Sequence, residues 1–276
     1  MRRLVIAGLA LALAAALADV VLLRSFEFIR HPSWIPPWTP HVTCPPPGPP
    51  VGAPLAEKLV FVIVDGLRVD TSTEMPELNR LRLRGTESIV RVEFPSFSRV
   101  GYANLLTGGG PRVHGYLSNN NRRPCPVPSI MDLARAAGIH TRLLHEHHTW
   151  LPAMFPSGFE QVDDLGTADL ATLRGGPARE LTVIYIAEPD LTAHEFGGAS
   201  AEYRRRALEV DARLGRIARA VDLTTTALIV VSDHGHIDRG GHGGHEALAM
   251  HAPLVAAGPG VDVSGIRRQE GVAVEA

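Results

Sequence analysis

The chain has 276 residues, and 45% of them are hydrophobic, enough to build the core of one large α/β domain or of two small ones. Its formal net charge of −2 and its isoelectric point near 6.7 show no basic excess, which argues against a nucleic-acid-binding protein. The 13 histidines are a high count, but they indicate metal or acid–base chemistry only where several fall at suitable spacings.

The first expected element is a transmembrane helix within residues 1–27. An apolar run over residues 4–23, interrupted by Asp19, follows two arginines and approaches the ~20 residues needed to cross a bilayer. Basic residues before the run favour a signal anchor that exports the rest of the chain. The alternative is cleavage after the Ala-Leu-Ala of residues 16–18, which would release a secreted protein. Both alternatives place the following domain on the periplasmic or extracellular side.

Residues 28–56 are expected to form a proline-rich linker. They include three consecutive prolines at 45–47 and lack a sustained apolar period. Such a segment separates a domain from a membrane without joining its core. The catalytic domain is therefore expected over residues 57–276.

The two cysteines, Cys44 and Cys125, are too few and too far apart for a zinc-ribbon pattern. In an oxidising compartment they could form a disulfide bond. Two free thiols in proline-rich loops agree equally well with the sequence, because spacing alone does not show whether the side chains meet.

Short apolar runs in this domain alternate with helical patterns. Five runs are expected to be buried strands, at Leu59–Val64, Ser88–Val92, Thr141–His145, Leu181–Ala187 and Ala227–Ser232. Ser129 is expected to cap a helix that ends at Gly138. Helical spacing predicts a longer helix with a buried face at Val210, Leu214, Ile217 and Val221. The alternation predicts an α/β fold with a mainly parallel central sheet and helices on both faces.

Acidic residues directly follow three of the five runs, where sites form in open α/β sheets. Asp65 follows the first run, Asp190 lies just beyond the fourth, and Asp233 follows the fifth. One such acid is equally well explained as a helix cap or turn residue. Three together indicate a functional site.

Histidines lie near these acids at spacings that suit metal binding. His194 follows Asp190 by four residues, so both side chains face the same way if the segment is helical. Asp233 and His234 are adjacent at a strand end, where a turn lets both reach one ion. The stretch HGHIDRGGHGGHE adds further histidines, namely His236, His242 and His245. Oxygen and imidazole ligands without cysteine fit catalytic zinc, and manganese or iron by ligand type.

The segment FPSFSRVGYANLLTG is expected to turn from a strand into a helix. Ser96 and Ser98 are both candidates for a nucleophile there. A serine at a helix N-terminus usually acts as a cap, so the residues alone do not choose between these roles.

These motifs resemble the alkaline phosphatase superfamily, and within it the type I phosphodiesterase and nucleotide pyrophosphatase branch. FVIVDGLRVD, FPSFSRVGYANLLTG followed by PRVHG, EPDLTAH, and SDHG with a later GGHG occur in that family's order, and the resemblance spans about Lys58–Gly260. KLVFVIVDGLRVD and GGHGGHEALAMHAPLVAAGPG are also similar to the catalytic domain of GPI ethanolamine phosphate transferases. A sulfatase is disfavoured because the residues after Ser98 do not follow the Cys/Ser-x-Pro-x-Arg pattern of that class.

The resemblance implies a role for each matching residue. Ser98 is the expected nucleophile, and Asn119 is expected to contact a phosphoryl oxygen. Two divalent metal ions are implied, with zinc preferred and manganese or iron as alternatives. Their expected ligands are Asp65, Asp233 and His234 at one site, and Asp190, His194 and His242 at the other.

The resulting hypothesis is an exported, membrane-anchored phosphoesterase of the phosphodiesterase or phosphatase type. Its substrate is expected to be a phosphate ester of a small molecule, a lipid or a glycan head group, and no nucleic-acid binding is expected. The alternatives are a membrane-anchored transferase of the phosphoethanolamine type and a metal-binding but inactive module.

Overall fold

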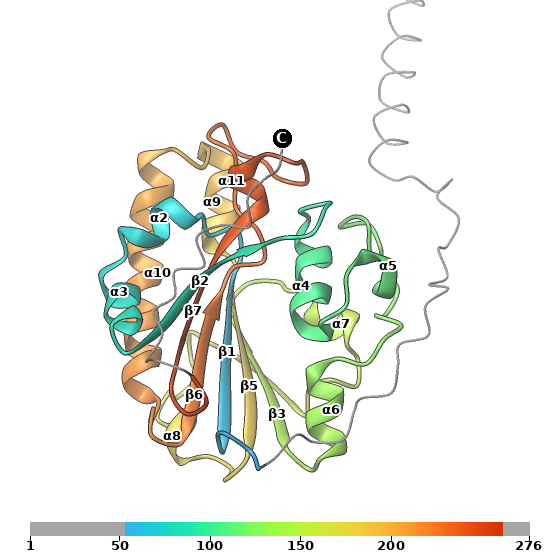
Figure 1. Cartoon of the computed structure of the whole chain (residues 1–276), viewed down its shortest axis with the longest axis vertical. Coiled ribbons are helices and arrows are strands. Elements are labelled where there is room, and N and C mark those ends of the chain that lie inside the picture. The colour runs from blue at the N-terminus through green and yellow to red at the C-terminus, as the bar shows by residue number, and fades with distance from the viewer. Residues whose placement is uncertain (1–52, 262–276) are drawn as a thin grey trace, which may run out of the picture. The chain divides into compact units, whose positions relative to one another are not determined.

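The structure is a computed structural model of the chain and describes residues 53–261. Seven strands form one sheet: β1 (Lys58–Val64), β2 (Gly85–Arg91), β3 (His140–His145), β4 (Gln161–Asp164), β5 (Glu180–Ile186), β6 (Thr226–Val231) and β7 (His251–Ala257). Their order is β2-β7-β6-β1-β5-β3-β4 (Figure 1).

The sheet is mainly parallel, as predicted. β1 lies at its centre and pairs in parallel with both β5 and β6, so that Val62 faces Ile184 on one side and Val230 on the other. β3 is parallel to β4 and β5. β7 runs antiparallel to both of its neighbours, β2 and β6. The carboxyl ends of β1, β5 and β6 therefore meet at one edge.

Ten helices connect or follow these strands in the part of the chain that the structure describes. They are α2 (Val69–Thr73), α3 (Pro76–Arg82), α4 (Ser98–Thr107), α5 (Pro111–His114), α6 (Ile130–Ala136), α7 (Leu151–Met154), α8 (Thr172–Gly175), α9 (Glu188–Phe196), α10 (Ala201–Ala220) and α11 (Ala247–Met250). The predicted cap of α6 is present, because the Ser129 hydroxyl accepts from the Asp132 amide in a capping box.

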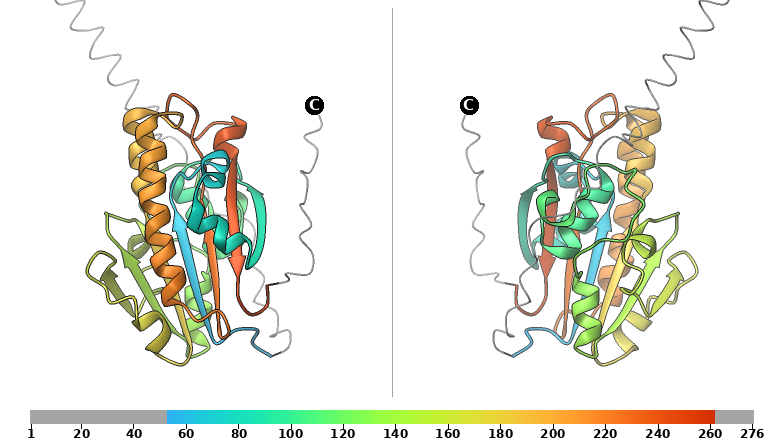
Figure 2. Two further views of the ribbon diagram at one scale, coloured as in Figure 1. Left: turned by 90° about the vertical axis from the view of Figure 1, so that its left-hand side faces the viewer. Right: turned by 90° about the vertical axis from the view of Figure 1, so that its right-hand side faces the viewer.

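Helices cover both faces of the sheet, as predicted (Figures 1 and 2). Successive side chains of β1 point to opposite faces. Val62 packs in a core cluster with residues of α3 and α10, including Leu78 and Leu214. Ile63 packs in the opposite cluster with residues of α4 and α6, including Leu106. Burying one side chain of this size stabilises the folded state by about 1.5–3 kcal/mol. Packing on both faces therefore holds β1 in the centre of the sheet.

All five predicted strands are present, but two further strands were not predicted. β4 is short, polar and largely exposed at the edge of the sheet, so it carries no apolar run. β7 contains Pro253, and a proline argues against an interior strand because it lacks a backbone donor. In the structure, Pro253 lies opposite Ile89 of the neighbouring strand β2.

Several predictions fall on residues outside 53–261. The expected transmembrane helix over residues 1–27 and nearly all of the linker over residues 28–56 lie there, as does Cys44, so its pairing with Cys125 stays a prediction. Among the helices of residues 53–261, none has both the length and the apolar character needed to cross a bilayer.

Candidate active site

The acidic residues that follow β1, β5 and β6 meet at one edge of the sheet. These strands are parallel neighbours, so their carboxyl ends lie side by side. Asp65 directly follows β1, Asp190 lies in the first turn of α9 after β5, and Asp233 lies just beyond β6. Ligands bind at this edge in open α/β sheets. The structure therefore brings together the three acids that the strand pattern singles out.

Backbone hydrogen bonds hold these acidic segments close together. The Asp65 amide donates to the Ile186 carbonyl at 2.8 Å, and the Asp190 amide donates to the Asp65 carbonyl at 3.1 Å. Gly66 adopts a φ of 68°, and a Cβ atom there would lie 2.8 Å from the Cα atom of Asp190. A larger residue would separate the segments, which explains the glycine at this position.

Asp65, Asp233 and His234 form the first candidate ligand group. One ligand atom from each lies within 4.8 Å of the others. The Nε2 atom of His234 is 3.3 Å from Oδ1 of Asp65 and 3.4 Å from Oδ2 of Asp233. Both oxygens are buried and lack a hydrogen-bond donor among the described residues. Because buried carboxylate oxygens are normally paired or bound to a metal, this group fits a divalent cation.

The second oxygen of each carboxylate is occupied by protein donors. The hydroxyl groups of Tyr102 and Tyr185 both donate to Oδ2 of Asp65, the latter at 2.7 Å. The Gly66 amide donates to Oδ1 of Asp233 at 3.2 Å. These bonds fix both carboxylates so that one oxygen of each remains available to an ion.

The His234 ring is oriented toward the same point. Its Nδ1 atom lies 3.0 Å from the Gly235 carbonyl and donates to it, so Nε2 faces the carboxylates. Burial alone would lower the pKa of His234, but the charges of Asp233 and Asp65 raise it to about 10. Burial and repulsion from Asp65 also raise the pKa of Asp233 well above its ordinary value. An ion at this group must therefore displace protons.

The expected second ligand set, Asp190, His194 and His242, lies close together, whereas the group whose ligand atoms all lie within 4.8 Å of one another is Asp190, His234, His236 and His242. The Nε2 atoms of His194 and His242 are 3.0 Å apart, and they lie 3.4 Å and 3.5 Å, respectively, from Oδ1 of Asp190. Nδ1 of His242 donates to the Ser96 carbonyl at 2.8 Å, so its Nε2 atom carries the lone pair and accepts from Nε2 of His194. Burial, followed by the charge of His234, lowers the pKa of His242 to about 2. His242 is thus neutral, as a metal-ligating histidine must be.

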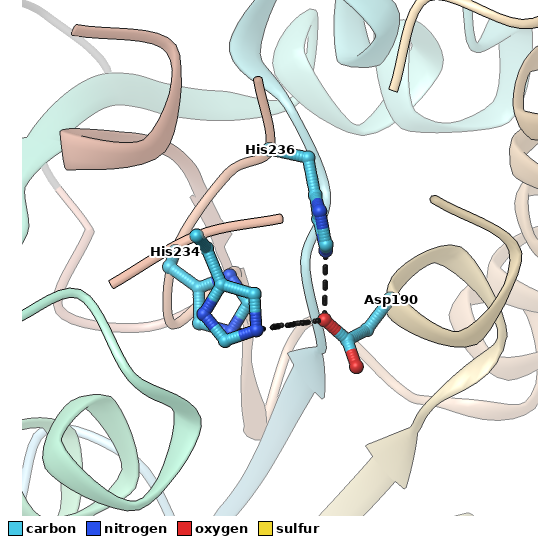
Figure 3. Close-up of side chains that lie close together, drawn as sticks. Asp190, His234 and His236 are labelled. Atoms are coloured by element: carbon cyan, nitrogen blue, oxygen red, sulfur yellow. Dashed lines mark hydrogen bonds and ion pairs between the residues drawn. The ribbon is translucent and has the colours of Figure 1, made fainter. Parts of the chain in front are cut away.

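His236 belongs to this group in space, although the sequence analysis did not assign it as a ligand. Its Nε2 atom lies 2.7 Å from Oδ1 of Asp190, and Figure 3 shows the carboxylate between His236 and His234. Burial alone would raise the pKa of Asp190, but hydrogen bonds from His194 and His236 lower it well below its ordinary value. The HGH spacing was visible in the sequence, yet it does not show which histidine reaches Asp190.

Ser98 lies at the first position of α4, and its hydroxyl faces the first ligand group. Its Oγ atom is 3.1 Å from Nε2 of His234. The Ser96 hydroxyl is engaged elsewhere, because it accepts from the Gly243 amide at 2.9 Å and donates to the Gly244 carbonyl at 3.0 Å. Of the two candidate serines, Ser98 is therefore the one with its hydroxyl beside the ligands.

Asn119 lies beside this serine, whereas Arg99 does not contribute its charge to the cleft. The Asn119 Oδ1 atom accepts from the Arg99 amide at 3.0 Å, which leaves the Nδ2 donors of Asn119 available. The Arg99 side chain is buried, donates to the Asn121 carbonyl, and stacks 4.6 Å from the centre of the Trp150 ring. Its guanidinium group supports the cleft wall.

A cleft of about 360 Å³ opens over the ligand groups. It is lined by Asp65, Ser98, Asn119, His147, His148, Trp150, Tyr185, Ala187, Asp190, Leu191, His194 and His242. A volume of this size admits a phosphoryl group with part of its substituent. The cleft thus joins the candidate nucleophile to residues of both ligand groups.

A third cluster beside the cleft has a different character. Glu146, His147 and Glu188 bring potential ligand atoms within 4.8 Å of one another. However, the Nη1 atom of Arg213 lies 2.7 Å from one oxygen of each glutamate. This arrangement is a largely buried ion-pair network that ties the His147 segment to α9.

The sequence profile of the type I phosphodiesterase / nucleotide pyrophosphatase family matches residues 59–155 and 159–258. These ranges include every predicted ligand, Ser98 and Asn119. A search of curated proteins gives no match to the chain.

Solved structures with the same fold are distant in sequence. Murine ectonucleotide pyrophosphatase/phosphodiesterase 5, solved as an inactive variant with AMP, is 21% identical, with a TM-score of 0.55, over 66% of this chain and 57% of its own length. The C-terminal periplasmic domain of EcEptC from Escherichia coli, in a complex with zinc, is 13% identical, with a TM-score of 0.56, over 74% of this chain and 73% of its own.

A third similar structure is the phosphonate monoester hydrolase of Agrobacterium radiobacter, 15% identical, with a TM-score of 0.57, over 74% of this chain and 68% of that enzyme. At these identities the likeness establishes the fold. This chain spans little more than half of the murine protein. The family profile covers most of the sequence, and the chain belongs to the type I phosphodiesterase / nucleotide pyrophosphatase family.

Proposed function

We propose that the chain is a metal-dependent phosphoesterase in which Ser98 is the nucleophile and two divalent ions, preferably zinc, assist the reaction. The observation that carries this proposal is the position of the Ser98 hydroxyl, 3.1 Å from Nε2 of His234 and within the cleft that contains Asp190 and His194. A nucleophile must lie beside the groups that activate it. Family membership supports phosphoryl chemistry at this position.

Six side chains would hold the ions, in the two groups described above: Asp65, Asp233 and His234, and Asp190, His194 and His242. Their oxygen and imidazole atoms suit zinc, with manganese or iron as alternatives. When bound, the ions would lower the pKa of the Ser98 hydroxyl and stabilise negative charge on the leaving oxygen. The zinc complex of the structurally similar EcEptC domain supports this choice of metal.

In the first proposed step, the Ser98 Oγ atom attacks phosphorus and its proton passes to water. A P–O bond to serine forms while the bond to the leaving group breaks on the opposite side, and the departing oxygen takes a proton from water to become the alcohol. In the second step, a water oxygen attacks the phosphoserine, which releases phosphate or a phosphomonoester and restores the hydroxyl. Charge develops on the non-bridging oxygens during both steps, and the Asn119 Nδ2 donors are placed at the cleft to stabilise it.

The substrate class we propose is a phosphate ester of a small molecule or of a lipid or glycan head group. The AMP complex of the murine structure supports a phosphoester ligand for this fold. We also propose that residues 57–276 form the catalytic domain, attached through the linker over residues 28–56 to an anchor within residues 1–27. The apolar run at residues 4–23 supports export of this domain.

Turnover of chromogenic phosphomonoesters and phosphodiesters by the purified full chain tests this function. We expect turnover with zinc and its loss after chelation, because both ligand groups converge at Ser98. An alcohol added as acceptor distinguishes hydrolysis from transfer, since a transferase forms product only when the acceptor is present. Zinc binding without turnover of either ester class would instead identify an inactive metal-binding module.

A further inference from the structure

We propose that His236 is a positioning residue that fixes the Asp190 carboxylate for the second metal ion. This inference rests on the proposed function, because it assumes that Asp190, His194 and His242 hold an ion. It concerns a residue outside the predicted ligand sets. Its starting observation is the 2.7 Å contact between Nε2 of His236 and Oδ1 of Asp190 (Figure 3).

The hydrogen bonds of His236 determine its tautomer. The Gly241 amide donates to Nδ1 of His236 at 3.1 Å, so Nδ1 must carry a lone pair. In the neutral imidazole the proton therefore lies on Nε2. That proton points to the Asp190 carboxylate, and His236 donates the hydrogen bond.

This arrangement is opposite to that of the ligand histidines. His234 and His242 donate through Nδ1 to the carbonyl groups of Gly235 and Ser96, so that Nε2 is the atom directed toward the proposed ions. His236 uses Nδ1 as the acceptor and Nε2 as the donor. It can therefore approach the same carboxylate without itself being a ligand.

The packing around His236 keeps the ring in this orientation. The side chain is fully buried. A Cβ atom at Gly66 would lie 2.9 Å from Nε2 of His236, and one at Gly198 would lie 3.0 Å from its Cβ atom. Glycine on both sides thus allows the ring to fill the space next to Asp190. The loop after β6 is joined in this way to α9, and the carboxylate cannot rotate freely.

Zinc titration of the full chain with His236→Leu and His236→Gln tests this role. His236→Leu removes the donor, whereas the side-chain amide of His236→Gln can donate to Asp190. We expect the wild-type protein to bind two ions and His236→Leu to bind one of them about 10–100-fold more weakly, the usual effect of losing such a partner. His236→Gln should recover most of that loss. His245→Leu, an exposed histidine of the same loop, is the matched control.

Cobalt substitution adds a readout that is independent of turnover. We expect His236→Leu to change the visible absorption of one bound cobalt ion, and His236→Gln to restore it. Circular dichroism of the metal-free variants checks folding, and His236→Met replaces the leucine variant if that variant does not fold.

Two outcomes would overturn the role of His236. Unchanged zinc affinities in the folded leucine or methionine variant would show that Asp190 does not need this donor. If both His236→Leu and His236→Gln bind one zinc ion fewer than the wild-type protein, His236 is itself a metal ligand. A wild-type protein that binds fewer than two ions would instead contradict the proposed two-metal function, so the two failures are distinguishable.

Discussion

The hydroxyl group of Tyr185 donates a 2.7 Å hydrogen bond to Oδ2 of Asp65. Tyr102 donates to the same oxygen from α4. Together they orient Asp65 so that its other oxygen faces His234 at 3.3 Å. Two elements that lie far apart in the sequence, α4 and β5, thus fix one proposed metal ligand.

The variant Tyr185→Phe should weaken zinc binding at the first ligand group. It removes one of the two tyrosine donors to Asp65, and loss of such a partner lowers metal affinity by about 10–100-fold. Competition with a chromogenic chelator measures the change. Tyr116→Phe is the matched control, because that buried hydroxyl donates to the Arg123 carbonyl. Equal affinities of the two variants would contradict the role of Tyr185.

Zinc binding at pH 7 should release at least one proton. Aspartate charges raise the pKa of His234 to about 10, so its Nε2 atom is protonated at pH 7 and must lose that proton to bind an ion. Affinity should therefore rise as the pH increases toward 10. Calorimetry in buffers of different ionisation enthalpy counts the protons. Zinc binding with no proton release would show that His234 is not a ligand.

His114 should make the metal-free protein less stable in acid. Burial lowers its pKa from 6.5 to about 4. Above pH 6.5 His114 is neutral in both the folded and the unfolded chain, so it does not lower the free energy of unfolding there. Between pH 6.5 and 4 the unfolded chain binds a proton that the folded chain does not, so stability falls by about 3 kcal/mol at most.

Urea unfolding across this pH range, compared with His114→Gln, isolates that contribution. The glutamine variant has no titrating group there, so its stability should depend less steeply on pH. Parallel pH profiles for the two proteins would exclude the assignment. The 2.7 Å contact between Nε2 of His114 and the Asn104 amide group fits a structural role for this histidine.

Asn119→Ala should reduce turnover by about 100–1000-fold, the range seen when a donor to a developing oxyanion is removed. It should leave zinc affinity unchanged, because Asn119 contacts the Arg99 amide and not a ligand. Steady-state kinetics and zinc titration measure the two effects separately. The exposed neighbour Asn120 provides the control variant Asn120→Ala. Equal kinetics for both variants would assign the role to another residue.

Much of this site could be predicted because its ligands follow strand ends. Buried apolar runs locate β1, β5 and β6, and an acidic residue follows each of them, so Asp65, Asp190 and Asp233 could be placed at one edge without coordinates. The four-residue spacing of Asp190 and His194 is realised in α9. These features depend on residues that are close together in the sequence, so hydrophobic periodicity and residue spacing can predict them.

Other features depend on contacts between distant segments. The choice between Ser96 and Ser98 needed the family resemblance, and the structure supplies the physical difference, since the Ser96 hydroxyl binds the glycine-rich loop. The donors to Asp65 come from α4 and β5, and His236 reaches Asp190 across 46 positions. No spacing rule encodes such pairs.

The most direct measurement of the central claim is the zinc-dependent kcat/KM for a chromogenic phosphate ester in Ser98→Ala and Ser96→Ala. We expect Ser98→Ala to lose at least about 1000-fold, because the attacking oxygen is removed. Ser96→Ala should retain turnover within about tenfold, since its hydroxyl only supports the loop that carries His242. Turnover that survives in a zinc-loaded Ser98→Ala variant, or is lost only in Ser96→Ala, would contradict the account.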